Sequence, residues 1–150
     1  MGNIFKRCYT FSLVIFITIV FVGCDSGDKE SMRDRTVRLL AGDSYKQWIV
    51  KEVFENGVTQ SISLCDSAYI LTMKTDFSWT ESYLSLQCPQ STEGSWSLNE
   101  DNTVITIEYI SWQSGTEIEQ KFMIVDLTND QFAYEVVSGN NLKIIHLKSQ

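Results

Sequence analysis

The sequence has little of the chemistry that enzymes and metal sites need. Its 150 residues contain one histidine, His146, and no glycine-rich phosphate-binding loop. A zinc site would need more ligands, and no nucleophile with an orienting third group is indicated beside this histidine, which is better placed on the surface or at a rim. Glu81 and Glu108 are a possible carboxylate pair, but alternating acidic residues are typical of a solvated sheet face, and only Glu81 shares a face with aromatic residues. We therefore expect no enzymatic activity, no metal and no cofactor.

Long apolar runs are also missing, because the longest one covers only residues 9–22. A membrane-spanning helix needs about 20 apolar residues, so this run is better matched by the apolar part of a secretory signal peptide. An N-terminal transmembrane anchor is the alternative. The run is followed by the tetrapeptide FVGC, ending at Cys24, which resembles the lipobox of bacterial lipoproteins. We therefore predict that residues 1–23 are a lipoprotein signal peptide and that Cys24 is lipidated.

Basic residues are scarce relative to acidic ones, with 12 Lys and Arg against 19 Asp and Glu. All of the acidic residues lie beyond Cys24 and two of the basic ones precede it, so residues 24–150 carry a net charge of −9. Such a surface is repelled by phosphate backbones and anionic lipid headgroups, which argues against nucleic acid as a partner and against electrostatic docking on a membrane. Membrane attachment would come from acyl chains.

The predicted location is the cell envelope, with the protein anchored to a membrane by lipid. Asp25, directly after the lipidated cysteine, retains lipoproteins at the inner membrane in some bacteria, whereas an acidic stretch at this place accompanies export to the surface in others. We favour the outer membrane or the cell surface over the inner membrane. The protein partner, if there is one, is not indicated by any motif.

Cysteine is used sparingly, and two of the four residues are already assigned. Cys8 lies within the predicted signal peptide and Cys24 takes the lipid, which leaves Cys65 and Cys88. In an oxidising compartment two spare cysteines most simply form a disulfide, and the competing zinc site lacks further ligands. Closing this loop of about 24 residues would stabilise the fold by about 3–4 kcal/mol in the chain-entropy model.

The sequence does contain a series of short β-branched and aromatic segments separated by turn residues. Residues 24–35 are polar and aperiodic, as in a flexible tether, and residues 36–41 are expected to form a short helix that ends at Gly42. Asn56-Gly57 predicts a tight hairpin between the first two strands. The nine predicted strands cover residues 45–54, 58–64, 68–73, 77–86, 93–98, 103–112, 117–127, 132–137 and 142–147.

These strands are expected to be apolar on one face. In the sixth strand, Ile105, Ile107 and Tyr109 share a face and Glu108 lies on the other. No connection is long enough for the crossover of a parallel sheet, so the strands form an antiparallel meander, which covers its apolar face by curling on itself. We therefore predict an all-β fold for residues 36–150, a small antiparallel up-and-down β-barrel of eight or nine strands with a short N-terminal helix.

Several short segments occur in order through the chain beyond the signal peptide. They are Leu39-Leu40-Ala41-Gly42 before Trp48, Cys65 followed by Tyr69-Ile70-Leu71, Lys74-Thr75-Asp76-Phe77-Ser78-Trp79, Cys88, Gly94-Ser95-Trp96-Ser97-Leu98, and Phe122-Met123-Ile124-Val125-Asp126-Leu127-Thr128. Together they resemble the lipocalin-like domain of bacterial lipoproteins over nearly all of the predicted mature chain. The resemblance implies a small up-and-down β-barrel and a lumen able to hold an apolar molecule.

Aromatic side chains supply the candidate ligand-binding residues. The seven candidates are Trp48, Trp79, Tyr83, Trp96, Tyr109, Phe122 and Tyr134. Flat apolar walls with a few polar groups are typical of ligand pockets, but a barrel of eight strands is also narrow enough for its own side chains to fill. For most of the seven we favour filling.

The function that follows is a lipid-anchored lipocalin-like lipoprotein that binds a small apolar or amphipathic ligand. The alternative is a structural or protein-interaction accessory lipoprotein with a solid barrel. A cavity on the order of several hundred Å³ would favour the first, and a filled core with an exposed apolar patch the second. A hollow barrel is expected to open at the rim opposite the helix of residues 36–41, with Trp79 and Trp96 as reporters of the ligand.

Overall fold

The structure is a computed structural model that describes residues 30–138 and 141–150. The predicted signal peptide, the predicted lipidation residue Cys24 and the first part of the predicted tether lie outside these residues. Among the residues that it describes, no helix is both long and apolar enough to cross a membrane.

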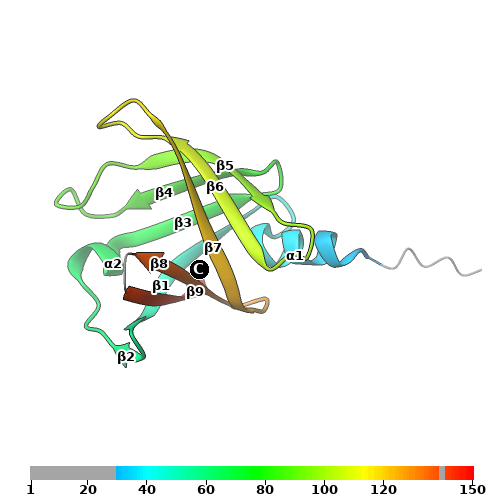
Figure 1. Cartoon of the computed structure of the whole chain (residues 1–150), viewed down its shortest axis with the longest axis horizontal. Coiled ribbons are helices and arrows are strands. Elements are labelled where there is room, and N and C mark those ends of the chain that lie inside the picture. Colours follow the sequence, from blue (N-terminus) through cyan, green and yellow to red (C-terminus); the bar gives the residue numbers. More distant parts are fainter. Residues whose placement is uncertain (1–29, 139–140) are drawn as a thin grey trace, which may run out of the picture.

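The described part of the chain forms two helices and nine strands (Figure 1). The helices are α1 (Met32–Ala41) and α2 (Leu64–Ala68). The strands are β1 (Tyr45–Glu55), β2 (Val58–Thr59), β3 (Tyr69–Lys74), β4 (Ser78–Tyr83), β5 (Thr92–Leu98), β6 (Val104–Ile110), β7 (Glu117–Leu127), β8 (Gln131–Ser138) and β9 (Asn141–Ser149). All paired strands run antiparallel, which confirms the predicted all-β antiparallel fold.

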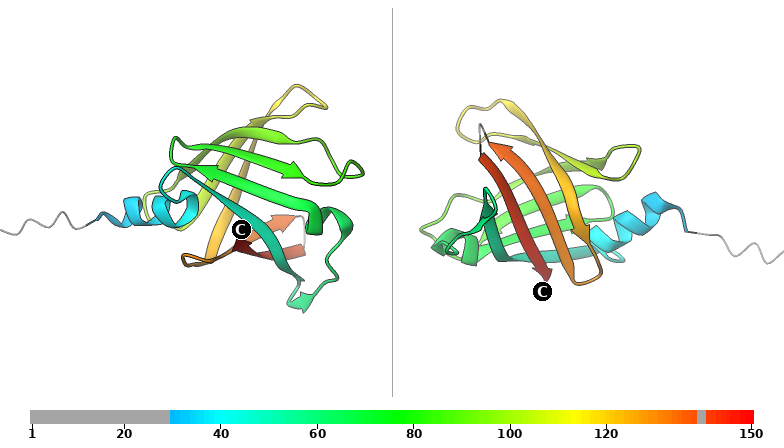
Figure 2. Two further views of the ribbon diagram at one scale, coloured as in Figure 1. Left: turned by 180° about the vertical axis from the view of Figure 1, so that it is seen from behind. Right: turned by 60° about the horizontal axis from the view of Figure 1, so that its bottom comes forward.

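Eight of these strands close into a barrel. They are hydrogen-bonded in the order β1-β3-β4-β5-β6-β7-β8-β9, and β9 pairs back with β1 from Ser149 opposite Trp48 to Lys143 opposite Glu55. The two-residue β2 pairs only with β1 and is an additional strand outside the barrel. Figure 2 shows the closed wall from two further sides. The predicted up-and-down β-barrel is therefore confirmed.

The second predicted strand, at residues 58–64, is wrong over most of its length. Only Val58–Thr59 pairs with β1, and the chain then leads into α2. The Ser63 side chain accepts a hydrogen bond from the backbone N–H of Asp66, and the Asp66 carboxylate accepts one from the backbone N–H of Ser63. This capping box starts a helix at Leu64, and β1 pairs directly with β3.

Helix α1 begins at Met32, earlier than the predicted start at residue 36. The Ser31 side chain caps the first turn by accepting the Asp34 N–H at 3.0 Å, and Asp34 places a negative charge at the positive end of the helix dipole. Residues 32–35, which we assigned to the flexible tether, are therefore helical. The predicted end is confirmed, since Gly42 has a φ of 66° and its N–H donates to the Arg38 carbonyl.

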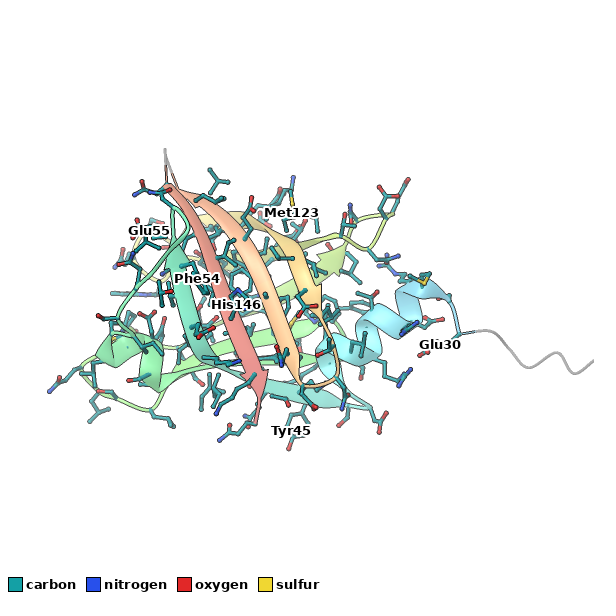
Figure 3. All side chains as sticks on the ribbon, turned by 90° about the horizontal axis from the view of Figure 1, so that it is seen from below. Glu30, Tyr45, Phe54, Glu55, Met123 and His146 are labelled. Atoms are coloured by element: carbon teal, nitrogen blue, oxygen red, sulfur yellow. A yellow bond between two sulfur atoms is a disulfide. The ribbon has the colours of Figure 1, made fainter. Side chains whose placement is uncertain are left out.

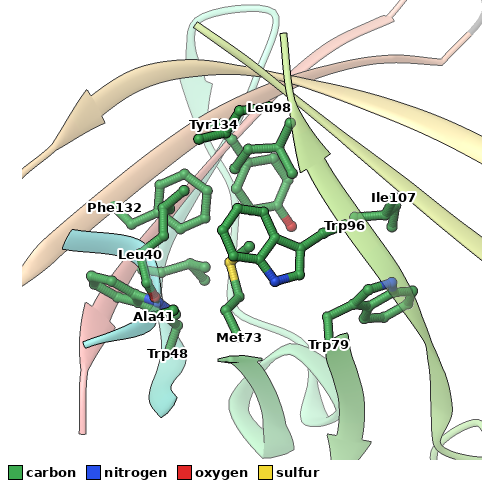
Figure 4. Packing of buried hydrophobic residues seen from close by; sticks show 12 residues of the cluster. Leu40, Ala41, Trp48, Met73, Trp79, Trp96, Leu98, Ile107, Phe132 and Tyr134 are labelled. Carbon is green, nitrogen blue, oxygen red and sulfur yellow. The ribbon is translucent and has the colours of Figure 1, made fainter. Parts of the chain in front are cut away.

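Helix α1 covers one rim of the barrel, which we call the closed end, over a densely packed part of the interior (Figure 4). Leu40 is fully buried with Trp48, and the Trp48 ring packs edge-on against Phe132 with ring centroids 5.6 Å apart. The Trp48 Nε1–H donates to the Leu40 carbonyl at 2.8 Å, so this buried polar group has a partner. Burying side chains of this size contributes roughly 1.5–3 kcal/mol each.

Cys65 and Cys88 form the predicted disulfide, with their Cα atoms 5.4 Å apart. Cys65 belongs to α2, directly before β3, and Cys88 follows β4, the neighbour of β3. The bridge therefore ties α2 to the loop of residues 84–91 at the rim opposite α1, which we call the open end. Figure 1 shows the two helices at opposite ends of the barrel.

Candidate ligand cavity

The barrel is hollow toward the open end. A cavity of about 310 Å³ lies there. It is lined by side chains from every barrel strand except β5, from α2 and from the loop after β4. This position matches the predicted opening opposite the N-terminal helix. The volume lies at the lower end of the roughly 300–1,000 Å³ typical of small-molecule sites.

The floor of the cavity is made of side chains that also belong to the packed core. Met73, Trp79, Ile105 and Phe132 line it, and each is at most 2% exposed. Their opposite sides pack toward α1 and the closed end. The interior is therefore divided into a filled half below α1 and a hollow half above this floor.

Trp79 owes its place in the floor to the glycine opposite it. Gly94 is its cross-strand partner in β5, and a Cβ at Gly94 would collide with the carbonyl oxygen of Glu108 and crowd the Trp79 indole nitrogen. The indole fills this space and packs edge-on against Tyr109, with ring centroids 5.8 Å apart and planes at 87°. A glycine is required here by the close approach of neighbouring backbone.

Helix α2 forms part of the mouth. Residues 45–49 of β1 pair with residues 70–74 of β3, whereas the rest of β1 pairs with β9 and β2. The strands β1 and β3 diverge toward the open end, where α2 packs against β1. From this position Cys65 and Asp66 line the cavity, and Pro89 joins them from the loop that the disulfide ties down.

The strand pairing between β7 and β8 covers only part of β7. Only residues 123–127 of β7 pair with β8, while residues 117–122 pair with β6 alone. Gln120 and Val136 line both the cavity and a shallow groove on the outer face of β7 and β8. Figure 1 shows the start of β7 leaning away from β8 and β9. The cavity and the outer groove therefore share two lining residues.

Three tyrosines carry polar groups into the upper part of the cavity. Tyr69 and Tyr83 are cross-strand neighbours with ring centroids 5.7 Å apart, and Tyr134 lines the same cavity from β8. Burial raises the pKa of each of the three hydroxyls, and the negative charge of Glu81 raises each pKa further. The three side chains are therefore neutral hydrogen-bonding groups at physiological pH.

Glu81 is the charged group that lies among these tyrosines. Its carboxylate accepts a hydrogen bond from the Tyr83 hydroxyl at 2.7 Å. No lysine or arginine among the described residues lies within 4.0 Å of it. Asp66 and Lys143 are the other charged residues that line the cavity, both nearer the mouth. The cavity is therefore apolar at its floor and mixed in polarity at its mouth.

Four of the seven predicted ligand-binding residues line the cavity, namely Trp79, Tyr83, Phe122 and Tyr134. Trp79 has two roles, because its indole packs in the core cluster and also forms part of the cavity floor.

The other three predicted residues, Trp48, Trp96 and Tyr109, do not line the cavity. Trp48 is enclosed by α1 and Phe132 at the closed end. Trp96 donates its Nε1–H to the Lys74 carbonyl at 3.1 Å, so it is not a reporter of the cavity. Tyr109 supports Trp79 from behind. Trp48 and Trp96 belong to the buried core cluster, and Tyr109 is a partly buried residue that packs against it.

Sequence reasoning missed several residues of the mouth. Tyr69 lies at the start of a predicted strand, and its alternation with the inward Leu71 was the signal that could have found it. Asp66 was missed because it falls in the connection between two predicted strands, where the structure has α2. Lys143 faces the cavity from a strand whose other inward residues are apolar, and a single basic residue in such a strand gives no distinct signal.

The other titratable candidates lie outside the barrel. Glu108 is exposed on the outer face of β6, as its alternation predicted. His146 alternates with the cavity-lining Ile145, and its ring lies 5.2 Å from that of Phe54 (Figure 3). Neither side chain lines the cavity. Glu81 and Glu108 therefore do not form the carboxylate pair that we considered.

The fold and the cavity define an eight-stranded antiparallel β-barrel that is filled at one end and hollow at the other. No protein-family model matches this chain, and no curated protein matches it significantly. The geometry of the cavity is therefore the basis on which a function is proposed.

Proposed function

We propose that this protein is a lipid-anchored, lipocalin-like lipoprotein whose barrel binds a small apolar or amphipathic molecule. The observation that carries the proposal is the cavity of about 310 Å³ at the open end. Its floor and walls are mainly apolar and aromatic, with a few polar groups near the mouth, which is the composition of small-molecule sites. We propose binding without catalysis.

The distribution of packing supports a ligand site rather than a loosely filled core. Below the floor, Trp48 and Trp96 are buried in the same core cluster as Leu40 of α1. Above it, the apolar surfaces of Leu71, Phe122 and their neighbours face a space open to solvent. Apolar surface in contact with water is unfavourable, and a bound apolar group would remove that contact.

The position of the helix fits the proposed anchor. Helix α1 lies at the closed end, so the chain enters the barrel on the side away from the mouth (Figure 2). A lipid on Cys24 would place the membrane on the side of α1. The open end would then face away from the membrane that holds the protein, where a small molecule can enter.

A protein-interaction accessory role is the second candidate, and a specific feature supports it. Several large apolar side chains near the open end are exposed, among them Leu84, Leu86, Ile110 and Trp112. Exposed apolar patches often mark protein interaction sites. We associated this role with a solid barrel, whereas the barrel has a cavity at its open end. Ligand binding is therefore the leading proposal.

The experiment is a calorimetric titration of the purified protein with a panel of fatty acids, sterols and haem-like molecules. The Leu71→Trp variant places a larger side chain in the cavity and should abolish binding of any member of the panel that the wild type binds. Leu86→Trp makes the same change at a fully exposed position and should leave binding intact. Equal binding by the wild type and by Leu71→Trp would contradict a site in this cavity.

A further inference from the structure

The carboxylate of Glu81 is a charged group inside an otherwise mainly apolar and aromatic cavity. We propose that the ligand is an amphipathic cation, whose amine or quaternary ammonium head is held by Glu81 and the tyrosine rings around it. The proposal rests on the ligand-binding function proposed above and names the chemical class of the ligand.

Glu81 faces the interior of the barrel from the middle of β4. Its cross-strand partners are Leu71 in β3 and Thr92 in β5, and Leu71 lines the cavity as Glu81 does. An ionised carboxylate has about four acceptor sites, and the hydrogen bond that the described residues supply comes from the Tyr83 hydroxyl. With no basic side chain within 4.0 Å in the described part of the chain, the carboxylate lacks a counter-charge. Glu81 is partly buried among the tyrosines, so a cation at this place would supply the missing counter-charge.

The surfaces around Glu81 are also suited to a cation. Tyr69, Tyr83 and Tyr134 line the same part of the cavity, and Phe122 stacks at a tilt against Tyr134 with ring centroids 4.8 Å apart. The faces of aromatic rings carry partial negative charge and attract ammonium groups, and several rings around one carboxylate are a recurring solution for quaternary ammonium ligands.

The field of the carboxylate extends over this whole set of rings. After burial, the charge of Glu81 contributes to the raised pKa of Tyr69, of Tyr83 and of Tyr134. Asp66 raises the pKa of Tyr83 and of Tyr134 in the same direction. A negative ligand head would meet the same repulsion that disfavours the tyrosinate forms, whereas a positive head would be attracted.

Lys143 is the one positive group that lines the cavity within the described residues. It is on β9, opposite Glu55 and Val136 in the strand ladders, and its charge does not lower the pKa of any of the three tyrosines. The cavity lining therefore holds two carboxylates, those of Glu81 and Asp66, against the single ammonium group of Lys143. Lys143 is nevertheless the group that an anionic ligand would use, so the test includes it.

The rest of the cavity fits the apolar part of such a ligand. From Glu81 toward the floor the lining consists of Leu71, Ile107, Trp79 and Phe132, none of which is charged. A head at Glu81 would leave an alkyl or ring portion to cover these side chains. An amphipathic cation satisfies both parts of the cavity at once.

The test uses the full chain in nanodiscs of zwitterionic lipid and three probes that share one alkyl chain: octyltrimethylammonium, octanol and octanoate. Partition of a probe into the lipid is the same for every variant, so differences between variants report the protein. By calorimetry we expect octyltrimethylammonium to bind about tenfold more tightly than octanol, and octanoate to bind most weakly. Glu81→Gln should keep the bond from Tyr83 and reduce ammonium binding to the level of octanol.

Two further variants separate the possible outcomes. Glu108→Gln removes the same charge from the outer face of the barrel and should leave the preference for the ammonium probe unchanged. Two results would overturn the proposed ligand class and still leave a ligand-binding barrel. In the first, octanoate binds most tightly and the Lys143→Gln variant no longer binds it. In the second, the Glu81→Gln variant still prefers the ammonium probe. Failure of all three probes to bind would instead count against the ligand-binding function itself.

Discussion

At the scale of single residues, Gly94 shows how the absence of a side chain shapes the cavity floor. The glycine leaves space on the inner face of β5, and the Trp79 indole occupies it. Trp79 is only 2% exposed and is held on its other side by Tyr109. The floor therefore depends on a residue that neither touches the cavity nor carries a functional group.

Gly94→Ala is expected to lower the free energy of unfolding by about 1–3 kcal/mol, because the new Cβ would collide with the Glu108 carbonyl and push β5 from β6. Urea unfolding followed by tryptophan emission measures this loss. Ser95→Ala, at the next position with its side chain outward, is the control and should change stability by much less. An unchanged midpoint for Gly94→Ala would show that the two strands are not this close.

The buried tyrosines predict a dependence on alkaline pH. Because burial raises their pKa above the unfolded value of about 10, the folded state holds more protons than the unfolded state once the pH exceeds about 10. Their contribution to stability is fully present below that pH and is lost as the pH rises further. Tyr134→Phe should make the alkaline loss of stability shallower in urea unfolding, whereas the exposed Tyr45→Phe should not. Identical slopes in wild type and Tyr134→Phe would contradict the burial of this hydroxyl.

Part of the site could be predicted from single residues because strand alternation decides which side chains face inward. This placed Tyr83, Phe122 and Tyr134 correctly, and it marked Glu81 as a charge on an aromatic face. Alternation does not give depth along the barrel, and for this reason Trp48 was grouped with residues that line the cavity although it lies beneath α1.

At the scale of elements, α2 and the loop of residues 84–91 act as one unit at the mouth. Helix α2 has five residues and is too short to be stable alone, so its place depends on packing against β1 and on the bond from Cys65 to Cys88. The bridge holds Asp66 and Pro89 at the cavity. The element that frames the mouth is therefore fixed covalently as well as by its capping box.

The double variant Cys65→Ser/Cys88→Ser is expected to lose about 3–4 kcal/mol of stability and to loosen the mouth before the barrel. Hydrogen exchange should accelerate at the amides of residues 64–68 and 84–91 while β6 stays protected. Reduction of the wild-type protein serves as the matched control and should give the same pattern. Protection that is equally high in the mouth with and without the bridge would contradict this role.

The elements differ in how far the sequence determines them. Strands β6 and β7 follow directly from their alternation, and the end of α1 follows from Gly42. The segment of residues 58–64 alternates as well, yet a capping box between Ser63 and Asp66 starts a helix there. Two local signals conflict in this segment, and pairing of β1 with β3, a contact distant in sequence, decides between them.

At the scale of the whole molecule, the closed end and the open end have separate roles in the proposed arrangement. Helix α1 covers the filled half, and the chain before it leads toward the predicted lipid attachment. The net charge of −9 beyond Cys24 gives the barrel no electrostatic attraction to anionic headgroups, so the lipid alone would hold it at a membrane.

Cys24→Ala is therefore expected to abolish incorporation of labelled fatty acid and to leave an uncleaved precursor in the host cell. Metabolic labelling with a fatty acid, followed by immunoprecipitation and electrophoresis, measures both effects. Cys8→Ala, which changes the other N-terminal cysteine, is the control and should label like the wild type. Unchanged labelling in Cys24→Ala would remove the basis for the predicted location.

Native mass spectrometry of the protein purified from its own host tests most directly whether the hollow half of the barrel binds a small molecule. The wild type should show an additional population heavier than the protein by the mass of one small molecule, and dissociation of that population should release it as a cation. The cavity-filling Leu71→Trp variant should lack this population, and Leu86→Trp should retain it. A wild-type spectrum with no bound molecule, or one that Leu71→Trp leaves unchanged, would contradict a ligand site in the barrel.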